Sequence, residues 1–235
     1  MKLDTRQRLF FFLAANFVVA LVVGDILGGK LTQITVGGHD FVISVGMIPF
    51  PVTFVLTDIL NEFYGKRAAR FVTMVGFAMA LFAYATIFVA MVIPWAPFTR
   101  DAGWDGMTAP SFDNVFNGSK RILVGSMCAY LVAQFLDIGT FNFLKRATKG
   151  RYLWLRATGS TVMSQLVDTI VITFIAWTGL LPMGTIVGMI VTSYLVKLVI
   201  AIGLTPVIYA AHTTVERLLH IPPVVLDDDG EPIET

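Results

Sequence analysis

The stretch Phe71–Thr99, FVTMVGFAMALFAYATIFVAMVIPWAPFT, contains no charged residue. A helix needs about 20 predominantly apolar residues to cross the hydrocarbon core of a bilayer, and this stretch is long enough. The whole chain has the same bias, because 56% of its 235 residues are hydrophobic and only 14% are charged. A soluble domain carries about 25% charged residues. The sequence therefore predicts an integral membrane protein.

Apolar segments of similar length recur on both sides of this stretch. Six transmembrane helices are predicted, at Leu9–Leu27, Gly46–Tyr64, Phe71–Trp95, Ile122–Leu144, Ala157–Leu181 and Met183–Ala211. We expect an all-α polytopic protein in which these helices form one compact bundle, a single transport domain over residues 1–220. A short outer β-hairpin is compatible with the alternating residues around 34–45. The acidic residues 221–235 are expected to form a disordered cytoplasmic tail.

Lys and Arg are unevenly distributed over the predicted loops. Twelve of the 17 lie at the N-terminus, after the second and fourth segments, and in the tail. Because cytoplasmic loops carry the excess of Lys and Arg, both termini are predicted to be cytoplasmic, which an even number of helices requires. The first segment begins like a signal peptide, but its apolar core is longer than the usual stretch of about 7–15 residues.

Composition and motifs argue against several classes of function. The net charge of +1 does not favour a nucleic-acid partner. With Cys128 as the single cysteine, no intrachain disulfide or multi-cysteine metal site is expected. The sequence has no P-loop and no H-E-x-x-H or G-x-S-x-G motif, so neither an ATPase nor an enzyme is expected. No metal or cofactor is predicted, and the expected partners are the lipid bilayer and a small-molecule substrate, with a homo-oligomer left open.

Polar side chains inside the predicted helices point to a binding cavity, because ionisable groups cost about 2.5–3.5 kcal/mol each at mid-helix. The fourth and fifth segments each carry Gln-x-x-Asp, as Gln134–Asp137 and Gln165–Asp168. Helical rise places them, with Lys197, in one band from the midplane toward the cytoplasm. The predicted substrate-binding residues are Asp58, Glu62, Gln134, Asp137, Gln165, Asp168, Lys197, Phe54 and Tyr130.

Simpler interpretations of these residues stay open at this point. Asp168 and Lys197 could be a neutralising pair that only joins two helices. Asp58 and Glu62 lie close enough to the basic residues 66–70 to be ordinary interfacial ion-pair partners.

Glutamine and carboxylate groups suit the N–H, amino and carbonyl groups of a guanine-type edge. They would equally bind a cationic amine, a protonated vitamin or a coupling proton.

Four motifs in these segments carry a resemblance to a known family. They are FPVTFVLTDILNEFYGKRAAR (50–70), RILVGSMCAYLVAQFLD (121–137), TKGRYLWLRATGSTVMSQLVDT (148–169) and VKLVIAIGLTPVIY (196–209). With these the chain resembles the queuosine precursor transporter family, also called the vitamin uptake transporter family. The resemblance runs through all six predicted helices in the same order.

The resemblance implies a multi-pass importer in the bacterial inner membrane. Its substrates would be the 7-deazaguanine bases 7-cyano-7-deazaguanine and 7-aminomethyl-7-deazaguanine, carried by a secondary carrier through alternating access. Arg121, Arg156 and Ser160 match family positions, and we assign them to a cytoplasmic or outer gate. The alternatives are a substrate-binding membrane subunit of an ATP-driven uptake system and, less favoured, an intramembrane enzyme.

Overall fold

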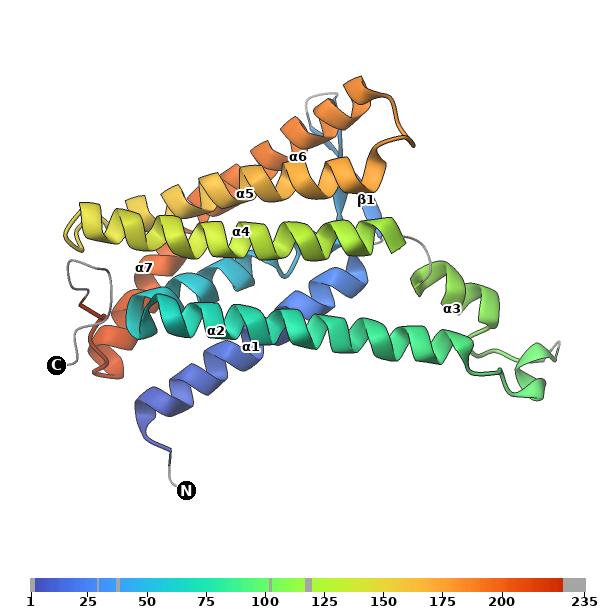
Figure 1. Cartoon of the computed structure of the whole chain (residues 1–235), viewed down its shortest axis with the longest axis horizontal. Helices are drawn as coiled ribbons and strands as arrows, with labels where there is room; N and C mark the ends of the chain where they lie inside the picture. Colours follow the sequence, from blue (N-terminus) through green and yellow to red (C-terminus); the bar gives the residue numbers. More distant parts are fainter. Residues whose placement is uncertain (1–2, 29, 37–38, 102, 117–119, 226–235) are drawn as a thin grey trace.

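The computed structural model describes residues 3–28, 30–36, 39–101, 103–116 and 120–225. Its main helices are α1 (Thr5–Leu27), α2 (Phe50–Val92), α3 (Ala109–Phe116), α4 (Lys120–Ala147), α5 (Leu153–Trp177), α6 (Met183–Gly203) and α7 (Thr205–Thr213). The short elements are the strands β1 (Leu31–Val36) and β2 (His39–Ser44), the 3-10 helices η1 (Val45–Met47) and η2 (Pro97–Arg100), and the π-helix η3 (Thr214–Leu218). The long helices run side by side as a bundle (Figure 1).

Five helical stretches of the described residues are long and apolar enough to cross a membrane. They are Thr5–Leu27, Val45–Val92, Gly125–Ala147, Leu153–Trp177 and Met183–Leu218. Many large apolar side chains on their outer faces are exposed, such as Phe12, Phe82 and Val199. Wide apolar exposure of this kind is unusual for a protein in water and expected for one surrounded by lipid.

The count of five differs from the predicted six because the second and third segments are joined. Both lie in α2, which is interrupted at Gly65, directly after the predicted end of the second segment at Tyr64. Residues 66–70, predicted as a loop, are instead helical and begin the second half of α2. A straight helix of 43 residues would be about 65 Å long, roughly twice the thickness of the hydrocarbon core. Gly65 interrupts α2, with φ 78° and ψ 173°, and divides it into two halves. Five candidate crossings result when α2 is counted once, and six when its halves are counted separately.

The bend at Gly65 depends on a conformation that side chains with a Cβ atom strongly disfavour. Gly65→Ala is expected to lower the free energy of unfolding by about 1–3 kcal/mol, because that conformation is costly for alanine. Thermal unfolding of the purified protein in detergent would measure the loss. Gly139→Ala is the matched control: Gly139 lies inside α4 with no neighbouring atom near a new Cβ, so this change should not destabilise. Equal melting of the two variants would contradict the prediction.

The sixth predicted segment is also divided. Met183–Ala211 is not one helix, because α6 ends at Gly203 and α7 begins at Thr205, with Pro206 in its first turn. Proline lacks a backbone N–H and tolerates the first turn of a helix but not its interior. Proline therefore explains why the helix restarts here.

The described strands span a slightly longer region than the 34–45 given by the sequence pattern. Strands β1 and β2 pair antiparallel, with Leu31 opposite Ser44 and Val36 opposite His39. The predicted turn residues 37–38 lie outside the described residues. Together with α3, the strands lie at the opposite end of the bundle from the two chain ends (Figure 1).

The apolar core lies where α1, both halves of α2 and α4 meet. Leu13 and Phe17 of α1 pack there with Leu60 and Phe63 of α2 and Ile138 of α4. The predicted tail reaches this core at its start: Ile221 is buried in it, and residues 226–235 lie outside the described residues. The start of α1 and the described residues after α7 lie at the end of the bundle that holds the α4–α5 connection (Figure 1). That end is the basic one, which we predict to be cytoplasmic.

Candidate substrate-binding cavity

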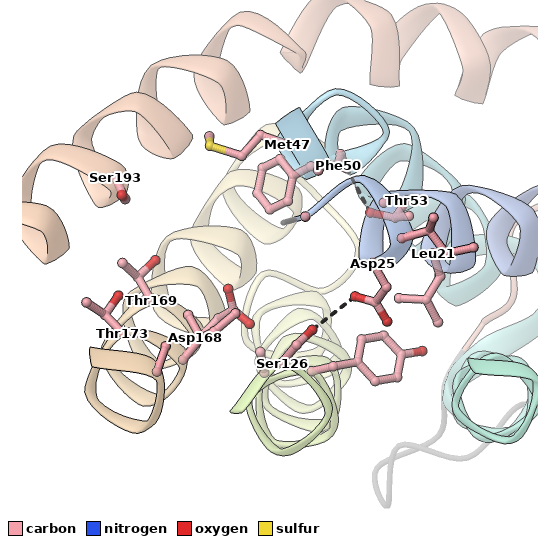
Figure 2. A pocket seen from close by; sticks show the side chains of 18 of the residues that line it. Leu21, Asp25, Met47, Phe50, Thr53, Ser126, Asp168, Thr169, Thr173 and Ser193 are labelled. Atoms are coloured by element: carbon pink, nitrogen blue, oxygen red, sulfur yellow. Dashed lines mark hydrogen bonds between the residues drawn. The ribbon is translucent and has the colours of Figure 1, made fainter. Parts of the chain in front are cut away.

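A cavity of about 450 Å³ lies among α1, both halves of α2, α4, α5 and α6. Small-molecule sites are commonly about 300–1,000 Å³ in volume. Its polar lining comes from several helices, including Asp25 of α1, Ser126 of α4 and Asp168 of α5 (Figure 2). The cavity extends to the end of the bundle at which α1 ends, where Phe116 of α3 also lines it.

The structure brings together seven of the nine predicted binding residues. Phe54, Tyr130, Gln134, Asp137, Gln165, Asp168 and Lys197 all line the cavity. They come from four helices, α2, α4, α5 and α6, so the shared band expected from helical rise becomes one shared cavity. Asp58 and Glu62 are not among the lining residues and lie elsewhere, as described below.

Asp168 and Lys197 form an ion pair on the cavity wall. Lys197 Nζ lies 2.6 Å from Asp168 Oδ2 and 5.2 Å from the centre of the Phe50 ring. The lysine therefore contacts both a carboxylate and the face of an aromatic ring, two partners that stabilise a cation in an apolar setting. Both side chains also line the cavity, so the pair joins α5 to α6 and is in reach of a bound molecule.

The two Gln-x-x-Asp motifs face each other across α4 and α5. Small buried residues such as Ala133 and Ser164 allow these helices to pack closely. Ser164 Oγ donates a hydrogen bond to Asp137 Oδ1 at 3.1 Å. Asp137 Oδ2 and the side-chain oxygens of Gln134 and Gln165 have no hydrogen-bond partner among the described residues. Buried acceptors without partners are costly, so this wall is suited to a ligand that supplies hydrogen-bond donors.

Aromatic side chains cover the cavity on the α2 and α4 sides. The rings of Phe50 and Phe54 pack edge to face with centroids 4.4 Å apart. Tyr130 is held by its hydroxyl, which donates to the carbonyl of Thr73 at 3.1 Å. A flat ring entering the cavity would meet aromatic surfaces as well as the polar wall, which favours stacking.

Glu62 is the centre of a buried ion cluster beyond the cavity, and with Arg156, Lys145 and His212 it forms the Glu62 cluster. Arg156 binds both carboxylate oxygens, with Nη2 at 2.8 Å and Nε at 3.1 Å. Lys145 Nζ lies 3.2 Å away and His212 Nε2 3.6 Å away. These partners come from α5, α4 and α7, so one carboxylate joins three elements to α2. Glu62 is thus placed with the predicted gate residue Arg156.

The other predicted residues near this end have different surroundings. Asp58 lies one helical turn before Glu62, is buried, and neither of its carboxylate oxygens has a hydrogen-bond partner among the described residues. Ser160 is fully buried and donates to the carbonyl of Ala157. Arg121 belongs to α4, and its side chain lies outside the described residues.

Sequence reasoning missed two parts of the lining. Asp25 is a carboxylate near the end of the first apolar segment, and no motif or polar stripe on that segment singles it out. The second part is α3, whose residues Asn114 and Phe116 come from a loop without a motif or a long apolar run. Neither charge pairs nor hydrophobic periodicity in the sequence could predict that α3 lies over the cavity.

Comparison with known proteins identifies relatives of this chain. Residues 44–211 match the family described as "Putative vitamin uptake transporter". A "Probable queuosine precursor transporter" of Bacillus subtilis is 30% identical over 72% of this chain and 71% of its own length. The "Queuosine precursor transporter" of Escherichia coli is 29% identical over 63% of this chain and 61% of its own. No solved structure matches.

The family match covers the cavity helices from α2 to α6, and the resemblance predicted from the motifs is confirmed. The long apolar helices fit the same assignment. The chain therefore belongs to the vitamin uptake transporter family and is a multi-pass protein of the bacterial inner membrane.

Proposed function

We propose that this chain imports queuosine precursors, in the form of 7-deazaguanine bases, and that the cavity between α1, α2, α4, α5 and α6 holds the base. The observation that carries the proposal is the wall of unpartnered acceptors, formed by Asp137, Gln134 and Gln165. A guanine-type edge presents a ring N–H and an amino group, and these donors match acceptors that line the same cavity. The names of the relatives, queuosine precursor transporters, support the same substrate class.

The aromatic residues give the base a second kind of contact. Phe54 and Tyr130 line the cavity together with the acceptor wall. A planar heterocycle can stack on their rings while its edge bonds to the polar groups, and base–aromatic stacking contributes about 1–3 kcal/mol per base. A planar base uses an aromatic surface and a donor edge together, so the combination favours a base.

Transport through this cavity would follow alternating access. The cavity reaches the end of the bundle where α1 ends, and the Glu62 cluster joins α2, α4, α5 and α7 at the other end. For the base to leave toward the basic end, the ion pairs of this cluster must separate. Secondary carriers commonly place their site near the midplane and move helices around it. The Glu62 cluster then acts as the gate on the predicted cytoplasmic side.

The proposal is tested by uptake of a labelled 7-deazaguanine base into bacterial cells that cannot synthesise it. We expect accumulation with the chain and none without it, and incorporation into transfer RNA would give a second readout. Purified protein in liposomes without any ATPase should also take up the base. Uptake in cells but not in such liposomes would replace the secondary carrier by the ATP-dependent alternative, and no uptake in either would refute the proposal.

A further inference from the structure

Asp25 is a carboxylate on the cavity wall that has no cationic partner among the described residues. It lies in the last turn of α1 and accepts a hydrogen bond from Ser126 Oγ of α4 at 3.0 Å (Figure 2). The lysine of the cavity, Lys197, is engaged by Asp168. Asp25 is partly buried, and a carboxylate removed from water without a counter-ion is costly in an apolar environment.

The charges of the described lining are unbalanced. Three aspartates, Asp25, Asp137 and Asp168, line the cavity together with a single lysine, Lys197. Because the Asp168–Lys197 pair is neutral in sum, two carboxylates are left without a cation from the lining. A ligand that carries a positive charge would correct this imbalance and would be attracted into the cavity.

The buried acceptors show that the same space is prepared for a ligand. Asp137 and Gln165 are at least nine-tenths buried, and each has a side-chain oxygen without a partner among the described residues. They belong to α4 and α5, whereas Asp25 belongs to α1. A ligand that meets both groups must therefore carry donors on one edge and a cation at a separate position.

We propose that Asp25 binds an ammonium group on the substrate, and that it sets a preference for aminomethyl- over cyano-substituted 7-deazaguanine. The identity of the base rests on the proposed function; the role of Asp25 does not follow from it. An alkyl ammonium donates hydrogen bonds, and it carries the positive charge that Asp25 lacks in a partner. A nitrile is an uncharged acceptor, so its nitrogen and the carboxylate repel each other and no hydrogen bond forms between them.

The test compares binding of the two bases to the purified full-length chain in detergent. Asp25→Asn keeps an acceptor for Ser126 and removes the charge. The dissociation constant of the aminomethyl base should rise by about ten- to a hundredfold, the range expected for loss of a hydrogen bond to a charged group. That of the cyano base should stay the same or fall, because the asparagine amide can donate to the nitrile. Asp101→Asn, an exposed aspartate outside the cavity, is the matched control and should change neither constant.

Two further ligands test the inference on the wild-type protein, independently of how the variant folds. The dimethylated aminomethyl base keeps its charge and should still bind, whereas the N-acetylated base, of similar size, should bind at least about tenfold more weakly. Equal binding of these two ligands, or an equal change for both bases in Asp25→Asn, would overturn the role of Asp25 and leave the proposed function standing. Wild-type protein that binds none of these bases would refute both.

Discussion

Glu62→Gln is expected to lower the free energy of unfolding by about 3–5 kcal/mol, the cost of breaking a buried ion pair by removing one partner. The glutamine is nearly the same size, so the effect comes from charge. Arg156 and Lys145 would remain buried, at 2% and 6% exposure, without the carboxylate that compensates them. For a protein of this length, such a loss lowers the melting temperature by about 10 °C.

The same substitution should also weaken the proposed gate on the cytoplasmic side. Glu62 joins α2 to α4, α5 and α7, and its backbone carbonyl accepts a hydrogen bond from the Val224 N–H at 2.9 Å. Without the carboxylate, the basic end is expected to open more readily. Labelling of single cysteines introduced at that end would report the change as faster modification. Membrane insertion is checked first, so that lost protein is not mistaken for lost function.

Glu216→Gln is the matched control for this prediction. Glu216 is exposed and lies 3.5 Å from the other ring nitrogen of His212, so it shares one partner with Glu62. Exposed ion pairs contribute about 0–1 kcal/mol, so this variant should melt almost like the wild type. If Glu62→Gln and Glu216→Gln had the same melting temperature, the Glu62 cluster would not be the stabilising centre described above.

Asp168→Asn is expected to reduce uptake of the base at least about thirtyfold, which corresponds to the lower limit of about 2 kcal/mol for truncating a buried charge pair. The reason is that Lys197 would lose its partner at 2.6 Å and remain charged on the cavity wall. An unpaired cation there would compete with the substrate for the remaining acceptors. The measurement is initial uptake rate in cells, normalised to the amount of inserted protein.

The double variant Asp168→Asn with Lys197→Met separates binding from structure. Removing both charges leaves no buried ion without a partner, so thermal stability should return toward the wild-type value. Uptake should stay low if the pair serves the substrate. Wild-type uptake by the double variant would show that the pair only joins α5 to α6. Asp105→Asn, at an exposed position outside the cavity, controls for loss of an aspartate in general and should transport normally.

Much of the candidate site was readable from the sequence because membranes make polar residues conspicuous. Gln134, Asp137, Gln165 and Asp168 stand out in apolar helices, and the helical repeat alone puts each pair on one face. All four line the cavity. The Asp168–Lys197 pair could also be anticipated, since charges in a membrane interior usually have partners.

The role of Glu62 could not be read in the same way. Its spacing from Asp58 predicted that both carboxylates lie on one face of α2, and they do lie one helical turn apart. However, α2 passes from the cavity wall at Phe54 to the ion cluster at Glu62 in about two helical turns. Which residues of a helix face meet the ligand depends on how far along the bundle the neighbouring helices extend beside it. That position is set by packing among α4, α5 and α7, and the spacing of residues within α2 does not reveal it.

Composition, hydrophobic length and charge distribution thus determined that this chain is a bundle of membrane helices with polar groups inside it. These properties are local, because each helix satisfies its own backbone hydrogen bonds in lipid and needs only enough apolar length. The tertiary structure alone decided that Asp25 and α3 reach the cavity, and that Glu62 faces Arg156. Those outcomes depend on contacts between residues far apart in the sequence, such as Asp25 and Ser126, 101 positions apart, which only packing of the whole bundle can fix.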